Sequence, residues 1–255
     1  MAGTVTLIPI SDFPLVAPGD DLADLVISAC EQAALAPVDG DILAFAQKVV
    51  SKAEGRYVDL ADIAPSADAK QLAAEVHKDA RLIEVILRES RRVVRHRPGL
   101  LIVEHRLGFI MANAGVDRSN VDPALGSEPV LLLPVDPDAS ASALLARLTG
   151  HFGKRLGVII TDSWGRAWRR GITGVALGVA GLPALVDMRG RSDLFGFELR
   201  MTQTAFADEI AAAASLVMGQ SDEGQPAVLV RGLSWSGDPL PAAALIRAAA
   251  EDLFR

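Results

Sequence analysis

Two segments of this sequence combine acidic and basic side chains in a pattern that could bind phosphate through a metal ion. In residues 158–171, an apolar run ends in Asp162 and Ser163 and turns at Gly165 into a basic patch. A buried strand that ends in a carboxylate and a hydroxyl can hold Mg²⁺ or Mn²⁺, which prefer oxygen ligands. Guanidinium groups match phosphate and carboxylate geometry, and the patch holds Arg166, Arg169 and Arg170. The alternative is that Asp162 caps a turn and that the arginines form a solvated surface.

The second segment, residues 105–122, places several amides and carboxylates after an apolar stretch. Its polar residues are Asn113, Gly115, Asp117, Ser119 and Asn120. Asp and Asn are common in turns because their side chains bond to the nearby backbone, so an ordinary polar loop is one interpretation. The other is a ligand site, in which Asp117 and Asp162 provide two carboxylates and an amide binds a nucleotide base.

Two lysines follow a predicted strand at residues 42–46. Lys48 and Lys52 lie four residues apart, so in a helix they share one face and repel each other unless an anion lies between them. Such a pair is usually a solvated face. Its position after a buried strand favours a binding role, because ligand sites of α/β proteins gather at the carboxyl ends of strands.

Apolar periodicity predicts a mixture of strands and helices around these segments. We expect strands at residues 5–10, 42–46, 100–104, 130–135 and 227–230. We expect one helix that starts near residue 22 and ends near residue 36, and one long or broken helix over 66–89. Further helices are expected at 139–148, 205–218 and 241–254. The glycines at 171, 174, 178 and 181 are interpreted as a close-packed helix face. Neither GxGxxG after a strand nor GxxxxGK[ST] occurs, so no dinucleotide fold or P-loop is indicated.

Composition restricts the class of protein. The 255 residues are 50% apolar, which suits a globular protein with one large core or two small lobes. The net charge of −7 argues against a nucleic-acid partner, which requires a basic face. Cys30 is the only cysteine and the histidines are scattered, so no disulfide or zinc site is indicated. With no secretory signal and no apolar run of about 18 residues, we expect a cytoplasmic protein without a membrane partner.

The sequence closely resembles the coenzyme F420-0:L-glutamate ligase family, also called F420-0:gamma-glutamyl ligase. Four segments carry the resemblance: AQKVVSKAEGR (46–56), HRLGFIMANAGVDRSNVD (105–122), VIITDSWGRAWRRG (158–171) and DMRGRSDLFGFELRMTQTAFADEIAAAASLVMG (187–219). LLLPVDPDASA (131–141) also fits. The segments keep the family's order and are spread over most of the chain.

The resemblance implies an activity and a fold. The family joins L-glutamate to the lactate carboxylate of coenzyme F420-0, using GTP, Mg²⁺ or Mn²⁺, and K⁺, through an acyl phosphate. It implies an α+β fold with mixed sheets and flanking helices in two lobes, assembled as an intertwined homodimer with the nucleotide near the interface. Residues 1–255 would form a single ligase unit without the C-terminal nitroreductase-like flavin domain of some relatives.

The resemblance also assigns residues. It implies that Asp117, Asp162 and Ser163 hold the metal, with serine at 163 where relatives often have threonine. Beyond the resemblance, the chemistry predicts that Lys52 and an arginine among Arg166, Arg169 and Arg170 neutralise the transferring phosphoryl group, and Arg166 and Arg169 are the catalytic candidates. The nucleotide site would comprise Phe13, Pro14, Leu15, Val16, Gln47, Lys52, Asn120, Gly219 and Gln220.

Three other interpretations stay open. The chain could be an amide ligase of the same fold that acts on a different carboxylate. It could be a metal- and nucleotide-binding regulator without catalysis, although such a protein would not need both aspartates, Lys52 and the arginines. It could also be a metal-dependent hydrolase, which the lack of a His-rich metal motif weakens.

Overall fold

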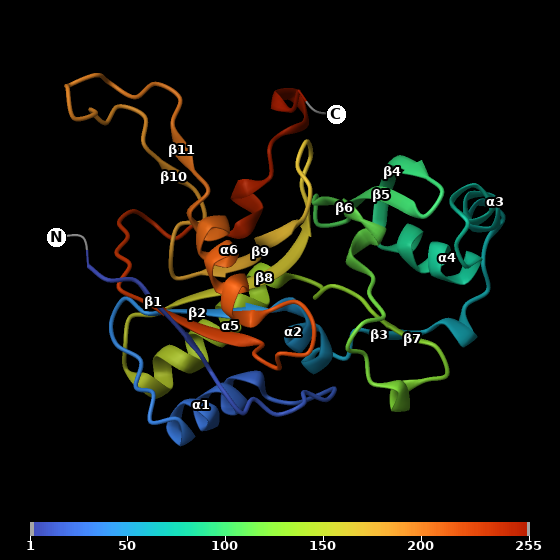
Figure 1. The fold of residues 1–255 in the computed structure, drawn as a ribbon, viewed down its shortest axis with the longest axis horizontal. Helices are drawn as coiled ribbons and strands as arrows, with labels where there is room; N and C mark the ends of the chain where they lie inside the picture. Colours follow the sequence, from blue (N-terminus) through green and yellow to red (C-terminus); the bar gives the residue numbers. More distant parts are fainter. Residues whose placement is uncertain (1–2, 254–255) are drawn as a thin grey trace.

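Strands from both ends of the chain form the main sheet (Figure 1). The computed structural model describes residues 3–253. The sheet has five strands in the order β1-β12-β2-β8-β9, namely β1 (Thr6–Pro9), β12 (Ala227–Arg231), β2 (Ile42–Ala46), β8 (Gly157–Gly165) and β9 (Ile172–Ala180). β1, β2 and β8 run in one direction, and β12 and β9 run in the other. The carboxyl ends of β1, β2 and β8 therefore lie at the same edge of the sheet.

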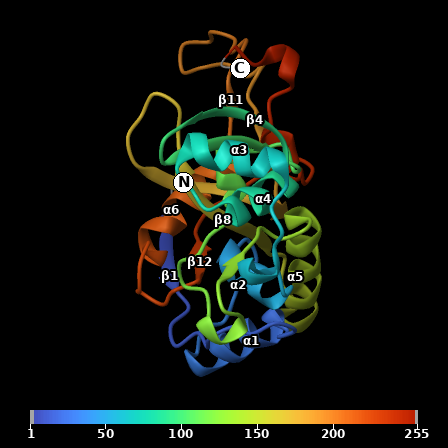
Figure 2. The ribbon, with the colours of Figure 1, turned by 90° about the vertical axis from the view of Figure 1, so that its right-hand side faces the viewer.

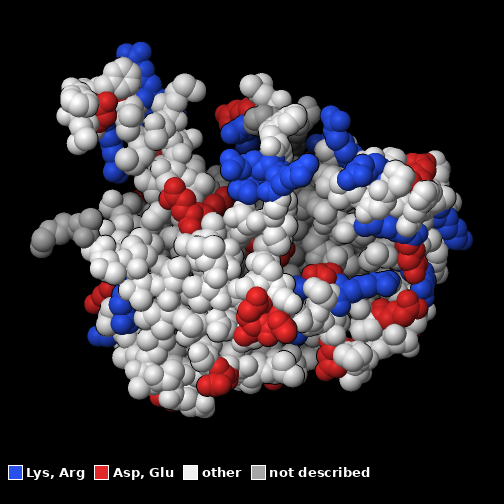
Figure 3. Space-filling model, viewed as in Figure 1, with Lys and Arg blue, Asp and Glu red and all other residues white. Residues whose placement is uncertain are grey.

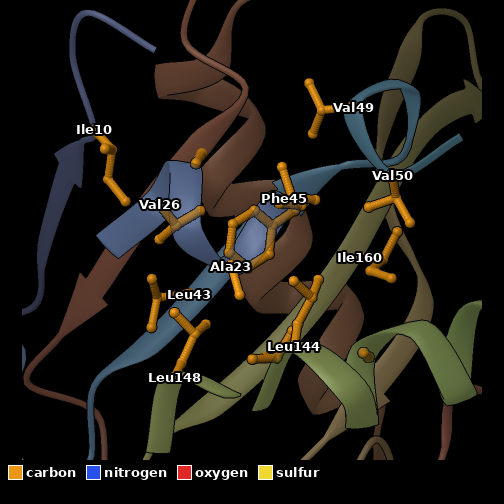
Figure 4. Packing of buried hydrophobic residues seen from close by; sticks show 14 of the residues in the cluster. Ile10, Ala23, Val26, Leu43, Phe45, Val49, Val50, Leu144, Leu148 and Ile160 are labelled. Atoms are coloured by element: carbon orange, nitrogen blue, oxygen red, sulfur yellow. The ribbon is translucent and has the colours of Figure 1, made fainter. Parts of the chain in front are cut away.

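Helices cover both faces of this sheet. They are α1 (Leu22–Gln32) and α5 (Pro137–Phe152) on one face and α6 (Phe206–Met218) on the other. The carboxylates of Asp21 and Asp136 accept hydrogen bonds from the first-turn amides of α1 and α5, which satisfies donors that a helix start leaves open. Phe45 lies at the centre of the first face, between side chains of α1 and α5 (Figure 4). Cys30 is fully buried in the same cluster, as its apolar neighbours predict.

A smaller region, residues 57–132, has its own apolar cluster. Figure 2 shows it from the front. It contains β3 (Tyr57–Asp59) paired with β7 (Pro129–Leu131), the helices α3 (Ala67–Val76) and α4 (Ala80–Arg88), and the sheet β4 (Ser90–Arg97), β5 (Leu100–His105) and β6 (Ile110–Ala112). The helix predicted over 66–89 is broken, because His77 adopts a left-handed conformation and ends α3. The molecule is thus a mixed α+β protein with several sheets.

The prediction of a helix at the glycine-rich segment was wrong. Gly174 and Gly178 lie on strand β9. Leu177 is an extra residue opposite the Ile160–Thr161 step of β8, and this bulge reverses the faces that the following residues present. As a result, Gly174 meets the backbone of α6 and Gly178 meets the start of α5 on the other side. The four-residue spacing of Gly174 and Gly178 therefore arises on a strand. Gly174 allows α6 to approach one face of the sheet, and Gly178 allows α5 to approach the other.

The prediction of a closing helix over residues 241–254 was also wrong for the described residues. Only two 3₁₀ turns form in the described part of this segment, Ala242–Leu245 and Ala249–Glu251, and Phe254 lies outside it. The backbone amides of Ala242 and Ala243 donate to the carboxylate of Asp138 in α5. This long-range contact fixes the segment locally and overrides the helix propensity of its alanines.

A long hairpin leaves the body of the protein between β10 (Val186–Asp187) and β11 (Gln203–Thr204) (Figure 1). The sequence predicts a loop there, and the connecting residues are mostly turns with large apolar side chains in solvent. Leu194 and Phe195 are 98% and 96% exposed. No helix within residues 3–253 has both the length and the apolar character needed to cross a membrane.

Candidate functional site

The candidate site lies at the edge where β1, β2 and β8 end. Helix α2 (Gln47–Ala53) begins directly after β2, so it carries Lys48 and Lys52 to this edge. Asp162 and Ser163 lie on β8 just beyond its last pairing with β2, Thr161 opposite Ala46. This arrangement follows from the parallel order of β2 and β8, and it agrees with the expectation that the lysines lie near a strand-end site.

Asp117 and Lys48 form the centre of the polar contacts. The Lys48 ammonium lies 2.8 Å from Asp117 Oδ2, and it also donates to the hydroxyl and carbonyl oxygens of Ser119. The backbone amide and hydroxyl of Ser119 both donate to the Asp117 carboxylate. Burial raises the pKa of Asp117, but the bonds from Lys48 and Ser119 outweigh burial, so its pKa lies below the ordinary value.

Asp162 belongs to the same electrostatic group. Burial raises its pKa to about 6, and the negative charge of Asp117 adds to this effect. Its own neighbour Ser163 opposes the rise by donating its amide at 2.8 Å, and so does the charge of Lys48. The two aspartates therefore sense each other and the same ammonium, as expected of carboxylates that face one space.

Loops distant in sequence meet around these aspartates. The amide nitrogen of Asn120 donates to the carbonyl oxygen of Ser221 at 3.0 Å. The hydroxyl of Ser163 donates to Gln220 Oε1 at 2.8 Å. Because neighbouring strand residues point to opposite faces, Ser163 turns toward the loop after α6, whereas Asp162 turns toward α2. The structure thus brings together Asp117, Asn120, Asp162, Ser163 and Gln220.

Lys52 lies one turn after Lys48 on α2. Burial lowers its pKa, the charge of Lys48 lowers it further, and Asp122 acts in the opposite sense. The expected repulsion between the lysines is therefore present. The hydroxyl of Tyr57, which like Lys52 is affected by the charge of Asp122, is buried without a hydrogen-bond partner among residues 3–253, although no sequence motif selects it. An anion between the two lysines would relieve this repulsion.

The backbone just before Asp117 is strained. Asn113, Ala114 and Gly115 adopt φ values of 53°, 53° and 68° in succession. For residues other than glycine this left-handed conformation costs about 1–2 kcal/mol each. The rings of Phe109 and Trp164 also contact each other, with their centroids 5.7 Å apart, and this contact packs the segment before β6 against β8. Together these features fix Asp117 in relation to the strand that carries Asp162.

The arginines of the 158–171 segment lie apart from this cluster. Arg166, Arg169 and Arg170 are exposed at the turn of the β8–β9 hairpin, beyond Asp162. In Figure 3, Lys and Arg side chains gather in the upper part of the face, where Figure 1 draws this turn and the β4–β5 pair. The structure therefore shows an exposed basic tip on the same hairpin as Asp162.

The other residues of the expected nucleotide site surround the lysine helix. In the segment Phe13–Val16, Leu15 is 95% exposed, whereas Val16 is buried. The segment is held near α2 because the amide of Gly19 donates to the carbonyl of Ala53. Gln47 is buried and accepts a hydrogen bond from Ser51 at 2.8 Å, so its side-chain oxygen serves the helix. Gly219 has a φ of 72°, and a Cβ there would overlap the carboxylate of Glu223.

The donor set fits a metal ion shared with a substrate. Asp117 and Asp162 offer carboxylate oxygens, and Ser163 and Gln220 add two more oxygens at the same edge. Within residues 3–253, no group of three or more His, Cys, Asp or Glu side chains is placed to hold a metal alone. Magnesium is commonly bound by one or two carboxylates with the remaining ligands from water and substrate phosphates. The residues present match that pattern.

Comparison with known proteins shows the family of the chain. Residues 11–232 match the family of F420-0:gamma-glutamyl ligases. The chain belongs to this family. The coenzyme F420:L-glutamate ligase of Methanothermobacter thermautotrophicus is 48% identical over 231 residues, which cover 91% of this chain and 90% of the relative. The ligase of the same name from Methanopyrus kandleri is 48% identical over the full length of both chains, and that of Archaeoglobus fulgidus is 45% identical over 92% of this chain.

As an F420-0:gamma-glutamyl ligase family member, the protein is an enzyme of the ligase class. All four segments that carry the sequence resemblance lie in the matched range, and three of them meet at the edge of the main sheet. Sequence reasoning selected Asp117, Asp162 and Lys52 but identified no partner for Lys48. Its contact with Asp117 depends on how α2 and the loop after β6 pack, which residue spacing does not reveal.

Proposed function

We propose that this protein adds L-glutamate to the lactate carboxylate of coenzyme F420-0 in a GTP-dependent reaction. Membership of the ligase family supports the reaction class, and the relatives named coenzyme F420:L-glutamate ligase support the substrates. The observation that carries the proposal is the ion pair between Asp117 and the ammonium of Lys48, whose charge also acts on Asp162, with Lys52 one turn away. Two carboxylates and two cations at a strand edge suit a metal–triphosphate substrate.

The reaction would proceed in two displacements. A carboxylate is a poor acyl donor, so its oxygen would first attack the terminal phosphorus of GTP, releasing GDP and forming an acyl phosphate. The amine of glutamate would then attack the acyl carbon, lose a proton and release phosphate. Such chemistry depends mainly on aligning anions and neutralising their charge.

The chain's own residues have separate tasks in this proposal. Lys52 would bind phosphate oxygens and stabilise the transferring group, and Asn120 and Gln47 would line the nucleotide site with Phe13–Val16 and Gly219. Arg166 and Arg169 would contact anionic substrate groups from the hairpin turn. Asp117, Asp162 and Ser163 would hold Mg²⁺ or Mn²⁺, which when bound neutralises phosphate charge. A K⁺ ion, implied by the resemblance, belongs to the same proposal.

We also propose two lobes and a homodimer. The main sheet with its helices would be one lobe and residues 57–132 the other, since each has its own apolar cluster. The exposed Leu194, Phe195 and Met201 of the β10–β11 hairpin supply apolar surface that a second copy would cover. The enzyme would act in the cytoplasm, without a nucleic-acid partner.

One incubation tests the activity. The protein is mixed with GTP, MnCl₂, L-glutamate and F420-0, and products are followed by mass spectrometry together with GDP release. We expect a glutamylated product and multiple-turnover GDP release only when all components are present. Multiple-turnover GDP release without F420-0 would indicate a hydrolase, whereas at most one GDP per active site is expected when only glutamate is left out. Product from another acid alone would indicate a different acceptor. Nucleotide binding with no turnover of any acid would indicate a regulator.

A further inference from the structure

Lys48 is a cation in direct contact with an expected metal ligand. Its ammonium is 2.8 Å from Asp117 Oδ2, and the side chains of the pair are 25% and 39% exposed. The hydroxyl of Ser119 donates to the same oxygen at 3.0 Å while Lys48 also contacts that hydroxyl. Asp117 Oδ2 is therefore already occupied by two donors.

Lys48 also lies within the field of the second carboxylate. Its charge acts on Asp162, which senses the charge of Asp117 as well. An ammonium in this position offsets one of the two negative charges, whereas a divalent cation would offset both. Both cannot hold Asp117 Oδ2 in the same way, because the ammonium and the cation would repel each other at contact distance.

We propose that Lys48 is an internal competitor of the divalent cation: its ammonium occupies the Asp117 carboxylate in the metal-free enzyme and is displaced when the cation binds. This inference rests on the proposed metal site at Asp117 and Asp162. It makes Lys48 a positioning residue, which keeps the carboxylates together in the empty site. The displaced ammonium is released next to Lys52, where phosphate oxygens of the nucleotide would receive it.

The exchange has a thermodynamic consequence. Binding a cation without nucleotide must break the contacts of Lys48 with Asp117 and Ser119, so the free enzyme binds the cation weakly. Nucleotide phosphates provide a new partner for the ammonium, so cation and nucleotide favour each other's binding. The site is thereby protected against holding a cation when no nucleotide is present.

The test measures Mn²⁺ affinity without nucleotide, by electron paramagnetic resonance of free Mn²⁺, for wild type, Lys48→Met and Lys52→Met. Lys52→Met is the matched control, because it removes the same charge from the same helix one turn further on. Titrations are made in 0.1 M and 0.5 M tetramethylammonium chloride. At the higher salt concentration the screening length falls to about 4 Å, so only a contact interaction persists.

We expect Lys48→Met to bind Mn²⁺ about fivefold or more tightly at both salt concentrations, the scale of one released ion pair. Lys52→Met should show a smaller increase in Mn²⁺ affinity at low salt and no increase at high salt. An equal affinity of Lys48→Met and wild type, or a gain that disappears at high salt, would overturn the exchange. Absence of Mn²⁺ binding in all three proteins would instead overturn the metal site of the proposed function. Lys48→Gln, checked by circular dichroism, provides a second variant if Lys48→Met does not fold.

Discussion

The side-chain amide of Asn120 donates to the carbonyl oxygen of Ser221 at 3.0 Å, joining loops that are 101 residues apart in sequence. The neighbouring bond from Ser163 to Gln220 adds the end of β8 to the same junction. A nucleotide held between these segments would contact parts of the chain that approach one another only in the folded protein. The site is therefore sensitive to small changes in how the loops meet.

Asp162→Asn should abolish ligation and leave the fold intact. The amide keeps the size of the side chain but lacks the charge needed for a metal–phosphate site, so we expect turnover to fall by about 10²- to 10³-fold or more. GDP release and mass spectrometry of the product measure this loss, and circular dichroism checks the fold. Near-normal turnover of the variant would remove the metal hypothesis.

The same variant should be at least as stable as the metal-free wild type at pH 7.5. The folded pKa of Asp162 is raised to about 6 from 3.8, so its contribution to stability is present below pH 3.8 and is lost as the pH rises through about 6. At pH 7.5 the wild type carries an unfavourable charge worth at most about 3 kcal/mol, which asparagine removes. Thermal unfolding in EDTA measures the difference, and a lower melting temperature for the variant would contradict the account.

Glu89→Gln should destabilise the protein and change its response to acid. Burial raises the pKa of Glu89, but the approach of His105 Nε2 to 3.7 Å and the charges of Arg106 and Arg56 outweigh burial and leave the pKa below 4.5. The ionised form therefore contributes stability above pH 4.5, and this contribution is lost as the pH falls through the lower folded value. Removing one partner of such a network costs about 3–5 kcal/mol.

Urea unfolding at pH 7, 5 and 4 measures the effect of Glu89→Gln. The variant should lose less stability than wild type between pH 5 and pH 4, because it lacks the titrating carboxylate. Glu75→Gln is the control, since Glu75 lies at the surface with its side chain 44% exposed and should change stability by less than about 0.5 kcal/mol. Equal acid sensitivity of Glu89→Gln and wild type would show that Glu89 is not ionised in the network.

Gly178→Ala should destabilise the fold, whereas Gly150→Ala should not. A Cβ at 178 would overlap the carbonyl of Pro137, so α5 would have to move away from β9, at a cost of about 1–3 kcal/mol or more. Gly150 lies on α5, and a Cβ added there would have no neighbouring atom of the described residues within 4 Å. Alanine at 150 should therefore raise the free energy of unfolding by about 0.5–1 kcal/mol through its helix propensity. Chemical unfolding of both variants shows whether each substitution raises or lowers the free energy of unfolding. No change for Gly178→Ala would contradict the close approach of α5 to β9.

Arg166→Ala and Arg169→Ala should each lower kcat/KM without lowering the melting temperature. Both side chains are exposed at the hairpin turn, so their loss leaves the core unchanged. If they bind anionic substrate groups, as proposed, each loss should cost about tenfold or more in kcat/KM. Steady-state kinetics with GTP and glutamate varied in turn identifies the affected substrate. Unchanged kinetics in both variants would exclude these arginines from the reaction.

The double variant Leu194→Ser/Phe195→Ser should convert a homodimer into a monomer. These side chains are almost fully exposed at the end of the β10–β11 hairpin. The substitutions therefore remove apolar surface and leave the buried apolar clusters of the described residues unchanged. Light scattering coupled to gel filtration gives the mass of each protein. A wild-type monomer, or a variant that stays dimeric, would contradict the proposed assembly.

The sequence predicts the strands at residues 42–46 and 227–230 well, because their apolar runs are bounded by turn residues and buried on both faces. It fails at Gly174 and Gly178, since a bulge in β9 imitates helical spacing. It also fails at Ala242, where a carboxylate from another helix captures the backbone amides. These errors share one cause, which is that long-range contacts override local preference.

The candidate site was predictable to the extent that its chemistry is local. Carboxylates, lysines and amides that follow strands identified Asp117, Asp162, Lys52 and Asn120 as candidates. The ion pair between Lys48 and Asp117 was not predictable, because it depends on the packing of two segments about 70 residues apart. The exposed position of Arg166 agrees with one of the two interpretations of the basic patch, the solvated surface, because the residues after Asp162 continue along an extended hairpin.

The position of β12 in the main sheet has a consequence for biosynthesis. Among the described strands β1 pairs only with β12, and β12 also separates β1 from β2, so the first strand to be translated has no partner until the last one is made. The nascent chain must therefore keep residues 6–9 unpaired until the ribosome has passed residue 231. Contacts between the chain ends slow folding, since the intervening loop must close first. Emergence of the N-terminal half is therefore not sufficient, and the sheet can be completed only after residues 227–231 have emerged.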